Sequence, residues 1–276
     1  MGKVIAVCTS DRKGIQKKDV STAHFSAEWG IDGDAHAGKW HRQISLLSAD
    51  KIEAFNKRGA NVIPGAFGEN LVVEGFDFRA LPVGTLLRCN DVLLEMTQIG
   101  KECHSHCEIY KKMGDCIMPR EGVFARVLEP GTISVGDEMT IVPREGHFPW
   151  QAAVITLSDK GAAGERKDES GPAIAQRLRD AGYAVVEEVL IPDDERILKQ
   201  QLMRLCDQRQ LDLILTTGGT GSAAQEAIRA AADKAAPSIT ASAVRGKTLI
   251  IGSPEERMDA LMDSAPQVME SLRNGR

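Results

Sequence analysis

The chain has 276 residues, of which 42% are hydrophobic and 26% charged, and it carries a formal net charge of −5 with a pI near 5.8. This composition is typical of a folded protein and excludes extended disorder, while the acidic balance excludes a basic field of the kind that binds nucleic acid. Because a single hydrophobic core rarely grows beyond about 250 residues, we expect two domains.

No uninterrupted apolar run approaches the roughly 18 residues that span a bilayer, and the N-terminus lacks the parts of a signal peptide. The six cysteines are too few and too unevenly placed for a secreted disulfide framework. We therefore expect a cytoplasmic protein with reduced thiols and without a membrane or nucleic-acid partner. Cys8, Cys89 and Cys206 lie in apolar runs and are expected to be small buried hydrophobes.

The first half of the chain has short apolar runs separated by Gly, Asp, Asn and Pro, a pattern that predicts β-strands. One helix is expected among them, over residues 49–57. Many short strands with turn residues between them favour a mainly β, barrel-like domain. The predicted strands cover residues 4–8, 44–47, 70–73, 85–89, 92–97, 123–128 and 138–142.

A glycine-rich loop over residues 30–38 offers polar groups within a short stretch, from Asp34, His36, His41 and Arg42. Glycines at this density let the backbone turn tightly and approach a ligand, which favours a functional loop. The alternative is a hairpin turn whose polar side chains only satisfy backbone groups. The residues alone leave both interpretations open.

Three cysteines follow the predicted strand that ends near residue 97: Cys103, Cys107 and Cys116. An exposed Cys103 near Lys101 would have more thiolate character, and a thiolate carries sulfur or ligates a soft metal. Alternatively, the three cysteines form a zinc or iron site with the neighbouring His104 and His106, or they are purely structural. A structural zinc clamp would make this domain an interaction module.

Several motifs in order along residues 1–143 resemble the MOSC family. They are Gly33-Asp34-Ala35-His36 with Arg42-Gln43, Phe67-Gly68-Glu69-Asn70-Leu71, a cysteine after the strand ending at Gln98, and Phe124-Ala125-Arg126-Val127-Leu128 leading to Gly131 and Gly136-Asp137. The resemblance implies a β-barrel, a link to pyridoxal phosphate binding, and a role in binding molybdenum cofactor or handing sulfur to a metal. It implies Asp34, His36 and Arg42 as cofactor-binding residues and Cys103 as the family cysteine.

Two prolines and a glycine interrupt regular structure between Pro143 and Pro149, where we place the boundary between domains over residues 1–145 and 150–276. Helical patterns begin near Pro172, which fits a first helical position, and recur at residues 198–206 and 258–272. Their alternation with strands predicts a three-layer α/β domain with a mostly parallel sheet. The buried strands are expected over residues 152–157, 185–190, 211–215 and 248–251.

The segment Thr216-Thr217-Gly218-Gly219-Thr220-Gly221 follows one of these strands and precedes a helix, so its backbone N–H groups suit a phosphate. Many such turns bind nothing. Strand ends gather in one crevice of a doubly wound sheet, which would bring Ser158, Asp159 and Asp193 beside the glycines. Carboxylates beside a phosphate indicate Mg²⁺, although capping of helix N-termini by Asp193 or Asp194 is the simpler role.

These segments are similar to the molybdopterin adenylyltransferase family of MogA and MoaB, whose members join AMP from ATP to the pterin phosphate. The resemblance covers residues 151–275. It implies that residues 217–221 bind the pterin, that Asp193 is catalytic, and that Ser253 and Pro254 form the last loop. The sequence departs at Glu226, which stands where the family has its second catalytic aspartate, and over residues 232–246, where the family's segment is much reduced. Residues for ATP binding and self-association would then be lost.

Three hypotheses follow. In the first, which we favour, the chain handles molybdopterin or molybdenum cofactor for cofactor-biosynthesis proteins or molybdoenzymes, using Cys103 for metal or sulfur. In the second, it is an active molybdopterin adenylyltransferase using ATP and Mg²⁺ held by Asp193 and Glu226. The third is the zinc-clamped interaction module with Cys103, Cys107 and Cys116 as ligands. Related adenylyltransferases are trimeric, so a homo-oligomer is considered as well.

Overall fold

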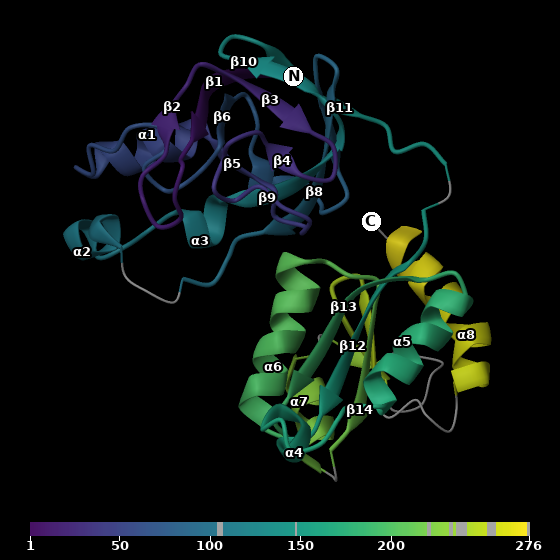
Figure 1. Cartoon of the computed structure of the whole chain (residues 1–276). Helices are drawn as coiled ribbons and strands as arrows, with labels where there is room; N and C mark the ends of the chain where they lie inside the picture. Colours follow the sequence, from purple (N-terminus) through teal and green to yellow (C-terminus); the bar gives the residue numbers. More distant parts are fainter. Residues whose placement is uncertain are drawn as a thin grey trace. The chain divides into compact units, whose positions relative to one another are not determined.

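The computed structural model describes residues 1–103, 107–146, 148–219, 222–231, 234–235, 242–252 and 258–274. The chain divides into two compact units, Met1–Glu145 and Gly146–Arg276 (Figure 1). Among the predicted site residues, Thr220, Gly221, Ser253 and Pro254 lie outside the described residues, as do His104 and His106.

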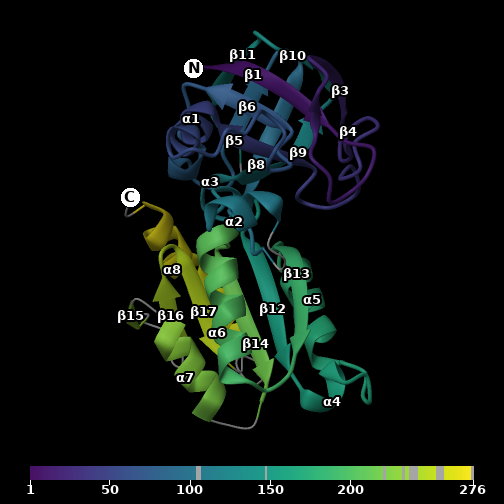
Figure 2. The same cartoon turned by 90° about the vertical axis from the view of Figure 1, so that its left-hand side faces the viewer.

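Eleven strands build the described part of the first unit. Seven of them pair in the order β11-β7-β8-β9-β5-β6-β1, and β11 pairs back onto β1, so the sheet closes into a barrel (Figure 2). Closure removes the free edges that an open sheet would expose. The strands are β1 (Gly2–Thr9), β2 (Lys18–Asp19), β3 (Thr22–Ser26), β4 (Gly30–Ile31), β5 (Ile44–Ser48), β6 (Leu71–Glu74), β7 (Leu86–Cys89), β8 (Val92–Ile99), β9 (Val123–Glu129), β10 (Gly131–Ser134) and β11 (Glu138–Val142).

The barrel confirms the predicted mainly β fold, because apolar side chains from its strands fill one continuous core that includes Val4, Leu46, Leu94 and Met139. Helix α1 (Ala49–Lys57) has the predicted bounds and buries Ile52 and Phe55 in a second cluster. The expectation of a single helix in this region was wrong. Helices α2 (Glu108–Met113) and α3 (Met118–Glu121) and a 3₁₀ turn, η1 (Phe78–Ala80), are too short to show a helical period in the sequence.

The second unit is a six-stranded sheet in the order β13-β12-β14-β17-β16-β15, in which the first four strands are parallel and the last two antiparallel. The mostly parallel α/β fold is therefore confirmed. Its elements are β12 (Gln151–Leu157), α4 (Asp159–Ala162), α5 (Ser170–Asp180), β13 (Ala184–Ile191), α6 (Glu195–Met203), a π-helical turn η2 (Arg204–Gln208), β14 (Leu213–Gly218), α7 (Ser222–Ala231), β15 (Lys234–Ala235), β16 (Ser242–Arg245), β17 (Thr248–Gly252) and α8 (Met258–Asn274).

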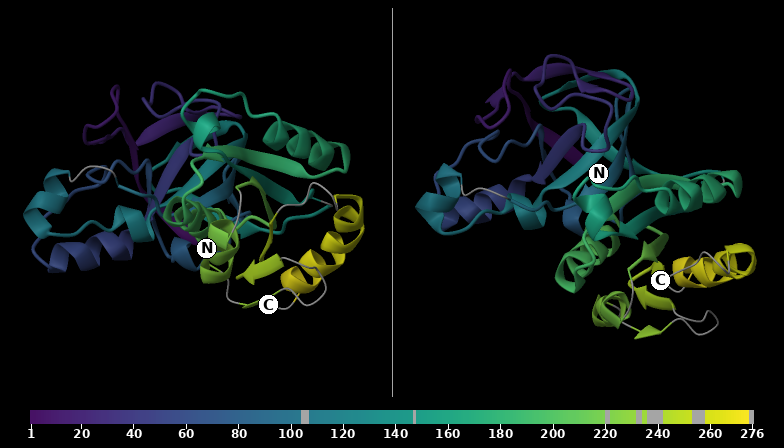
Figure 3. Two further views of the ribbon diagram at one scale, coloured as in Figure 1. Left: turned by 90° about the horizontal axis from the view of Figure 1, so that it is seen from below. Right: turned by 60° about the horizontal axis from the view of Figure 1, so that its bottom comes forward.

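Helices cover both faces of this sheet. Ile174 and Leu178 of α5 and Met269 of α8 pack on one face, in a cluster with the strand residues Val154 and Leu215. A separate cluster holds α6 and α7 against the opposite face. Figure 3, in which α8 is yellow, shows this unit from two further directions. The unit therefore has three layers, helices–sheet–helices, and the site is expected at the ends of the strands in the middle layer.

Pro172 is the third residue of α5 rather than the first, because the helix begins at Ser170. Its missing N–H still costs nothing there, since the first four N–H groups of a helix have no intrahelical partner.

The thiols of Cys8, Cys89 and Cys206 are buried, as predicted. Burial raises the pKa of the Cys8 and Cys89 thiols to about 12, so both are neutral at physiological pH.

None of the helices in the described part of the chain has both the length and the apolar character needed to cross a membrane.

Candidate functional site

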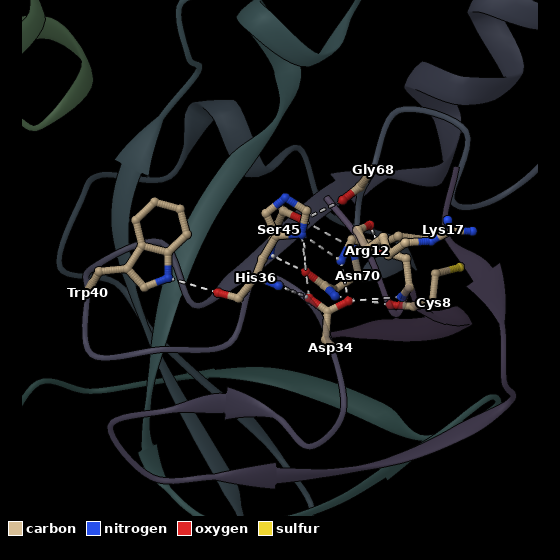
Figure 4. Close-up of polar contacts among 10 residues, drawn as sticks. Cys8, Arg12, Lys17, Asp34, His36, Trp40, Ser45, Gly68 and Asn70 are labelled. Carbon is tan, nitrogen blue, oxygen red and sulfur yellow. Dashed lines mark hydrogen bonds and ion pairs between the residues drawn. The ribbon is translucent and has the colours of Figure 1, made fainter. Parts of the chain in front are cut away.

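A buried ion pair lies in the first unit at the glycine-rich loop that the sequence singled out. Lys17, which precedes β2, donates from Nζ to the Asp34 carboxylate, and each side chain is only 1% exposed (Figure 4). The same carboxylate also accepts hydrogen bonds from the backbone N–H groups of Ser10 and His36, at 3.1 and 3.0 Å. Asp34 therefore ties three segments of the chain together.

The surroundings of this ion pair shift the pKa values of both side chains. Burial works against ionisation of Asp34, yet hydrogen bonds from Lys17 and from the backbone N–H groups of Ser10 and His36 hold the pKa of its carboxyl well below the usual range. Burial lowers the pKa of the Lys17 amine, and the hydrogen bond and charge of Asp34 oppose that shift. A buried carboxylate without its cation would be strongly destabilising, so the pair holds together as a unit.

His36 lies at the solvent side of the pair, with its side chain 34% exposed. Its Nδ1 is 3.3 Å from Lys17 Nζ and 3.7 Å from the second oxygen of Asp34. The carbonyl of His36 accepts a 2.9 Å hydrogen bond from the indole N–H of Trp40, which fixes the backbone on either side of the ring. The loop thus presents one partly exposed imidazole above a buried charge pair.

The glutamate of the Phe67-Gly68-Glu69-Asn70 motif holds the backbone segment that pairs with Lys17. The fully buried Glu69 accepts hydrogen bonds from the backbone N–H groups of Gly65 and Phe67, at 2.7 and 3.0 Å. Gly65 in turn pairs with the Lys17 backbone, and a Cβ there would lie 2.3 Å from the Lys17 carbonyl oxygen. Burial raises the pKa of Glu69 to about 7. The motif therefore positions Lys17.

Arg42 and His41 connect this loop to the strand that leads to Cys103. His41 Nε2 lies 2.9 Å from Gln98 Oε1, and the Gln98 amide donates to the Gly100 carbonyl at 2.7 Å. The Arg42 guanidinium lies over the rings of Trp40 and Phe124, at 4.8 and 5.5 Å from their centres. The structure therefore brings the Gly-rich loop and the start of the Cys103 segment to the same end of the barrel.

Cys103 and Cys107 are exposed, whereas Cys116 is buried in the apolar cluster beneath α1. Burial raises the pKa of the Cys116 thiol. An apolar environment that disfavours the thiolate also disfavours metal ligation by Cys116. The zinc or iron site on the three cysteines stays a prediction.

In the second unit, the carboxyl ends of β13, β12 and β14 meet, as the parallel sheet predicted. Asp159, two residues after the end of β12, accepts a 2.9 Å hydrogen bond from the backbone N–H of Asp193, two residues after the end of β13. A Cβ on Gly219 would lie 3.0 Å from Asp193 Oδ1, so this carboxylate faces the glycine turn that ends β14. The positive φ angles of Gly218 and Gly219, +73° and +75°, strongly favour glycine at both positions.

Helix capping separates the roles of the neighbouring polar residues. Asp194 accepts from the Ile197 N–H at 2.8 Å and caps α6, while Ser158 accepts from the Gly161 N–H at 3.1 Å and caps α4. Capping was the simple alternative for Asp193 or Asp194, and Asp194 is the residue that does it. Asp193 faces the glycine turn.

Thr217 is fully buried, and Glu226 is exposed on α7. Across the described ranges, no group of three or more His, Cys, Asp or Glu side chains is placed to hold a metal ion. A magnesium ion between Asp193 and Glu226 stays a prediction.

Lys17 is the residue that sequence reasoning missed. It is a lone lysine in a polar loop, and neither composition nor motif marks it as buried. The available signal was Asp34 itself, because a carboxylate in a tight glycine loop requires a cation if it is buried.

Two family models match the chain. The MOSC domain model matches residues 33–140, and the model described as "Probable molybdopterin binding domain" matches residues 153–254. The chain carries a MOSC domain followed by a domain of the molybdopterin-binding family, as the motifs predicted.

Curated relatives include two molybdopterin adenylyltransferases. The one from Pyrococcus furiosus is 40% identical over 78 residues, which are 28% of this chain and 45% of that protein. The one from Escherichia coli is 36% identical over 90 residues, which are 30% of this chain and 46% of that protein. The chain thus spans about half the length of the curated relatives it matches.

Similar solved structures include the molybdopterin biosynthesis enzyme MoaB from Thermus thermophilus, with 31% identity, 46% of this chain and 98% of that chain covered, and a TM-score of 0.41. For YiiM from Geobacillus stearothermophilus, identity is 19%, coverage is 52% of this chain and 76% of that chain, and the TM-score is 0.42.

The Lys17–Asp34 pair predicts non-additive effects of mutation. Lys17→Met or Asp34→Asn alone removes the partner of a buried charge and should cost the barrel about 3–5 kcal/mol. The double variant should cost at least about 1 kcal/mol less than the sum. Hydrogen exchange of barrel amides in the full chain measures each value. Lys18→Met, at an exposed neighbour, is the control, and strictly additive costs would contradict the pairing.

Proposed function

We propose that this chain handles molybdopterin or molybdenum cofactor, and that its second unit binds the pterin through its phosphate. The observation that carries the proposal is the meeting of Asp159, Asp193 and the Gly218–Gly219 turn at adjacent strand ends. Ligands of open α/β sheets bind at the carboxyl ends of the strands. The matched molybdopterin-binding family and the names of the relatives support a pterin as the ligand.

The phosphate would be held by backbone rather than by lysine or arginine side chains. The Gly219 N–H already donates to the Leu157 carbonyl at 3.2 Å, so it fixes the turn. The donors are the N–H groups that open α7, since the first turn of a helix lacks internal partners and carries partial positive charge. Residues 217–221, which lead into this helix, are the proposed pterin-binding segment, with Ser253 and Pro254 as the further proposed pterin contacts.

For the first unit we propose a separate role in binding molybdenum or carrying sulfur. Cys103 is the proposed thiolate, either as a ligand of molybdenum or as a carrier of sulfur, and its exposure suits both. His36 and Arg42 are the proposed donors to the cofactor. Asp34 is fully engaged with Lys17 and backbone amides, so we assign it a supporting role. Cofactor-biosynthesis proteins or molybdoenzymes would receive the cofactor or the sulfur.

Pyridoxal phosphate binding, which the MOSC resemblance also implied, stays a prediction. Lys17 does not offer the accessible amine for it, because its amine is 1% exposed and bonded to Asp34.

Adenylyl transfer is the second candidate function. The specific observation in its favour is that Asp193 faces the glycine turn beside Asp159, where a carboxylate and a phosphate could share Mg²⁺. Glu226 on α7 is the second proposed ligand. Magnesium there would neutralise the charge that develops on the ATP phosphates.

Pterin binding should depend on Gly218. The change Gly218→Ala places a Cβ 2.4 Å from the Leu157 carbonyl oxygen at a φ of +73°, so the turn must shift. We expect at least a tenfold loss of molybdopterin affinity, about 1.4 kcal/mol, by equilibrium titration of the full chain. Gly182→Ala is the matched control, because Gly182 also has a positive φ, +85°, but no atom within 4 Å of the new Cβ. Equal affinities in both variants would contradict a pterin site at this turn.

Cys103 should account for metal or sulfur retention. Cys103→Ala should abolish bound molybdenum or protein persulfide in anaerobically purified protein, while Cys107→Ala, which removes another exposed thiol, should retain it. Elemental analysis and persulfide labelling measure both. If zinc is bound stoichiometrically and is lost in Cys107→Ser and Cys116→Ser, with unfolding, the clamp replaces this role.

Adenylyl transfer has its own test, an assay of AMP transfer from labelled ATP to molybdopterin with Mg²⁺. If the second candidate is right, Asp193→Asn should lower the rate by at least about a hundredfold, because it removes a charged ligand of the metal. Asp194→Asn keeps the capping acceptor of α6 and should leave the rate near wild type. Wild-type protein without any transfer would rule the activity out.

A further inference from the structure

His36, Lys17 and Asp34 form a compact set of polar groups whose hydrogen-bond roles can be assigned. A lysine ammonium has three N–H donors and no acceptor, whereas a neutral imidazole has one donor and one acceptor nitrogen. Lys17 Nζ and His36 Nδ1 lie 3.3 Å apart, and in a hydrogen bond between them the ammonium donates and Nδ1 accepts. The ring proton then resides on Nε2.

The charge state of Lys17 follows from its partner. The Asp34 carboxylate is ionised at neutral pH, and Lys17 is the cation that contacts it in the barrel interior. Lys17 is 1% exposed and its backbone is fixed against Gly65, so its ammonium has little room to leave Nδ1.

The competing partner for the ring is Asp34 itself. Its second oxygen lies 3.7 Å from His36 Nδ1, within reach of an Nδ1–H if Lys17 did not already occupy that nitrogen. The two neighbours therefore favour opposite tautomers, and the shorter contact, from Lys17, decides between them.

We infer that Lys17 is a positioning residue: it fixes His36 as the Nε2–H tautomer, so that the ring offers one N–H donor to an oxyanion of the bound ligand. This inference rests on the proposed function. With Nδ1 turned to Lys17 and the side chain 34% exposed, Nε2 is the nitrogen left for a ligand. The oxyanion is either an oxo group of the metal or a free phosphate, which share the same acceptor chemistry.

The tautomer is read directly by long-range proton–nitrogen NMR of the full chain, labelled with ¹⁵N-histidine, at a pH near 8. His36→Gln identifies the signal among the six histidines. We expect a protonated Nε2 and an unprotonated Nδ1 in the wild type. In Lys17→Met the proton should move to Nδ1, because Asp34 becomes its acceptor, and Lys17→Arg should restore Nε2–H.

Two results would overturn the inference: Nδ1–H in the wild type, or Nε2–H unchanged in Lys17→Met. If Lys17→Met does not fold, Asp34→Asn decides. Asp34→Asn keeps the Lys17 donor and should keep the Nε2–H tautomer. Loss of that tautomer would show that Asp34, and not Lys17, determines the tautomer of His36.

The ligand is tested with molybdate and with inorganic phosphate as separate probes. One of them should shift the Nε2 resonance of the wild type, and the anion that does so identifies the source of the oxyanion. Lys17→Met should weaken that binding about tenfold or more, as loss of a supporting hydrogen bond usually does. No shift with either anion would refute the donor role. Failure of molybdopterin to bind while the tautomer is as expected would instead refute the proposed function alone.

Discussion

The first unit depends on a lysine and an aspartate that are hidden from water together. Removing two charges from solvent costs several kcal/mol each, and their attraction repays this only when the remaining hydrogen bonds are satisfied. Asp34 meets that condition with Lys17 on one side and the N–H groups of Ser10 and His36 on the other. The geometry of the loop over residues 30–42 follows from this pair, because His36 and Trp40 are held relative to it.

A different constraint shapes the second unit. Parallel strands that pair side by side place their carboxyl ends at one edge, so β13, β12 and β14 bring distant sequence segments together without long-range side-chain pairing. Asp159 and Asp193 are 34 positions apart in the chain, yet the backbone of one binds the side chain of the other. Glycine at positions 218 and 219 is what allows the third strand to turn at that edge.

The sequence was most informative where local pattern and topology coincide. Most core strands, helix α1 and the gathering of Asp159 and Asp193 followed from apolar runs and the rule for parallel sheets. Short polar elements such as β2 and α2 did not, because too few residues carry a period. Lys17 was missed for another reason: it contacts Asp34 and the backbone of Gly65, which Glu69 holds in turn, and no local pattern connects these residues to it.

We propose a phosphate site at the start of α7 in the second unit and, independently of it, a thiol for metal or sulfur in the first unit. Analysis of the metal and pterin content of anaerobically purified full chain, beside Cys103→Ala, tests this claim most directly. The account predicts pterin in both proteins and molybdenum or transferable sulfur only in the wild type. Wild-type protein that contains neither, and that does not take up molybdopterin at micromolar concentration, would contradict it.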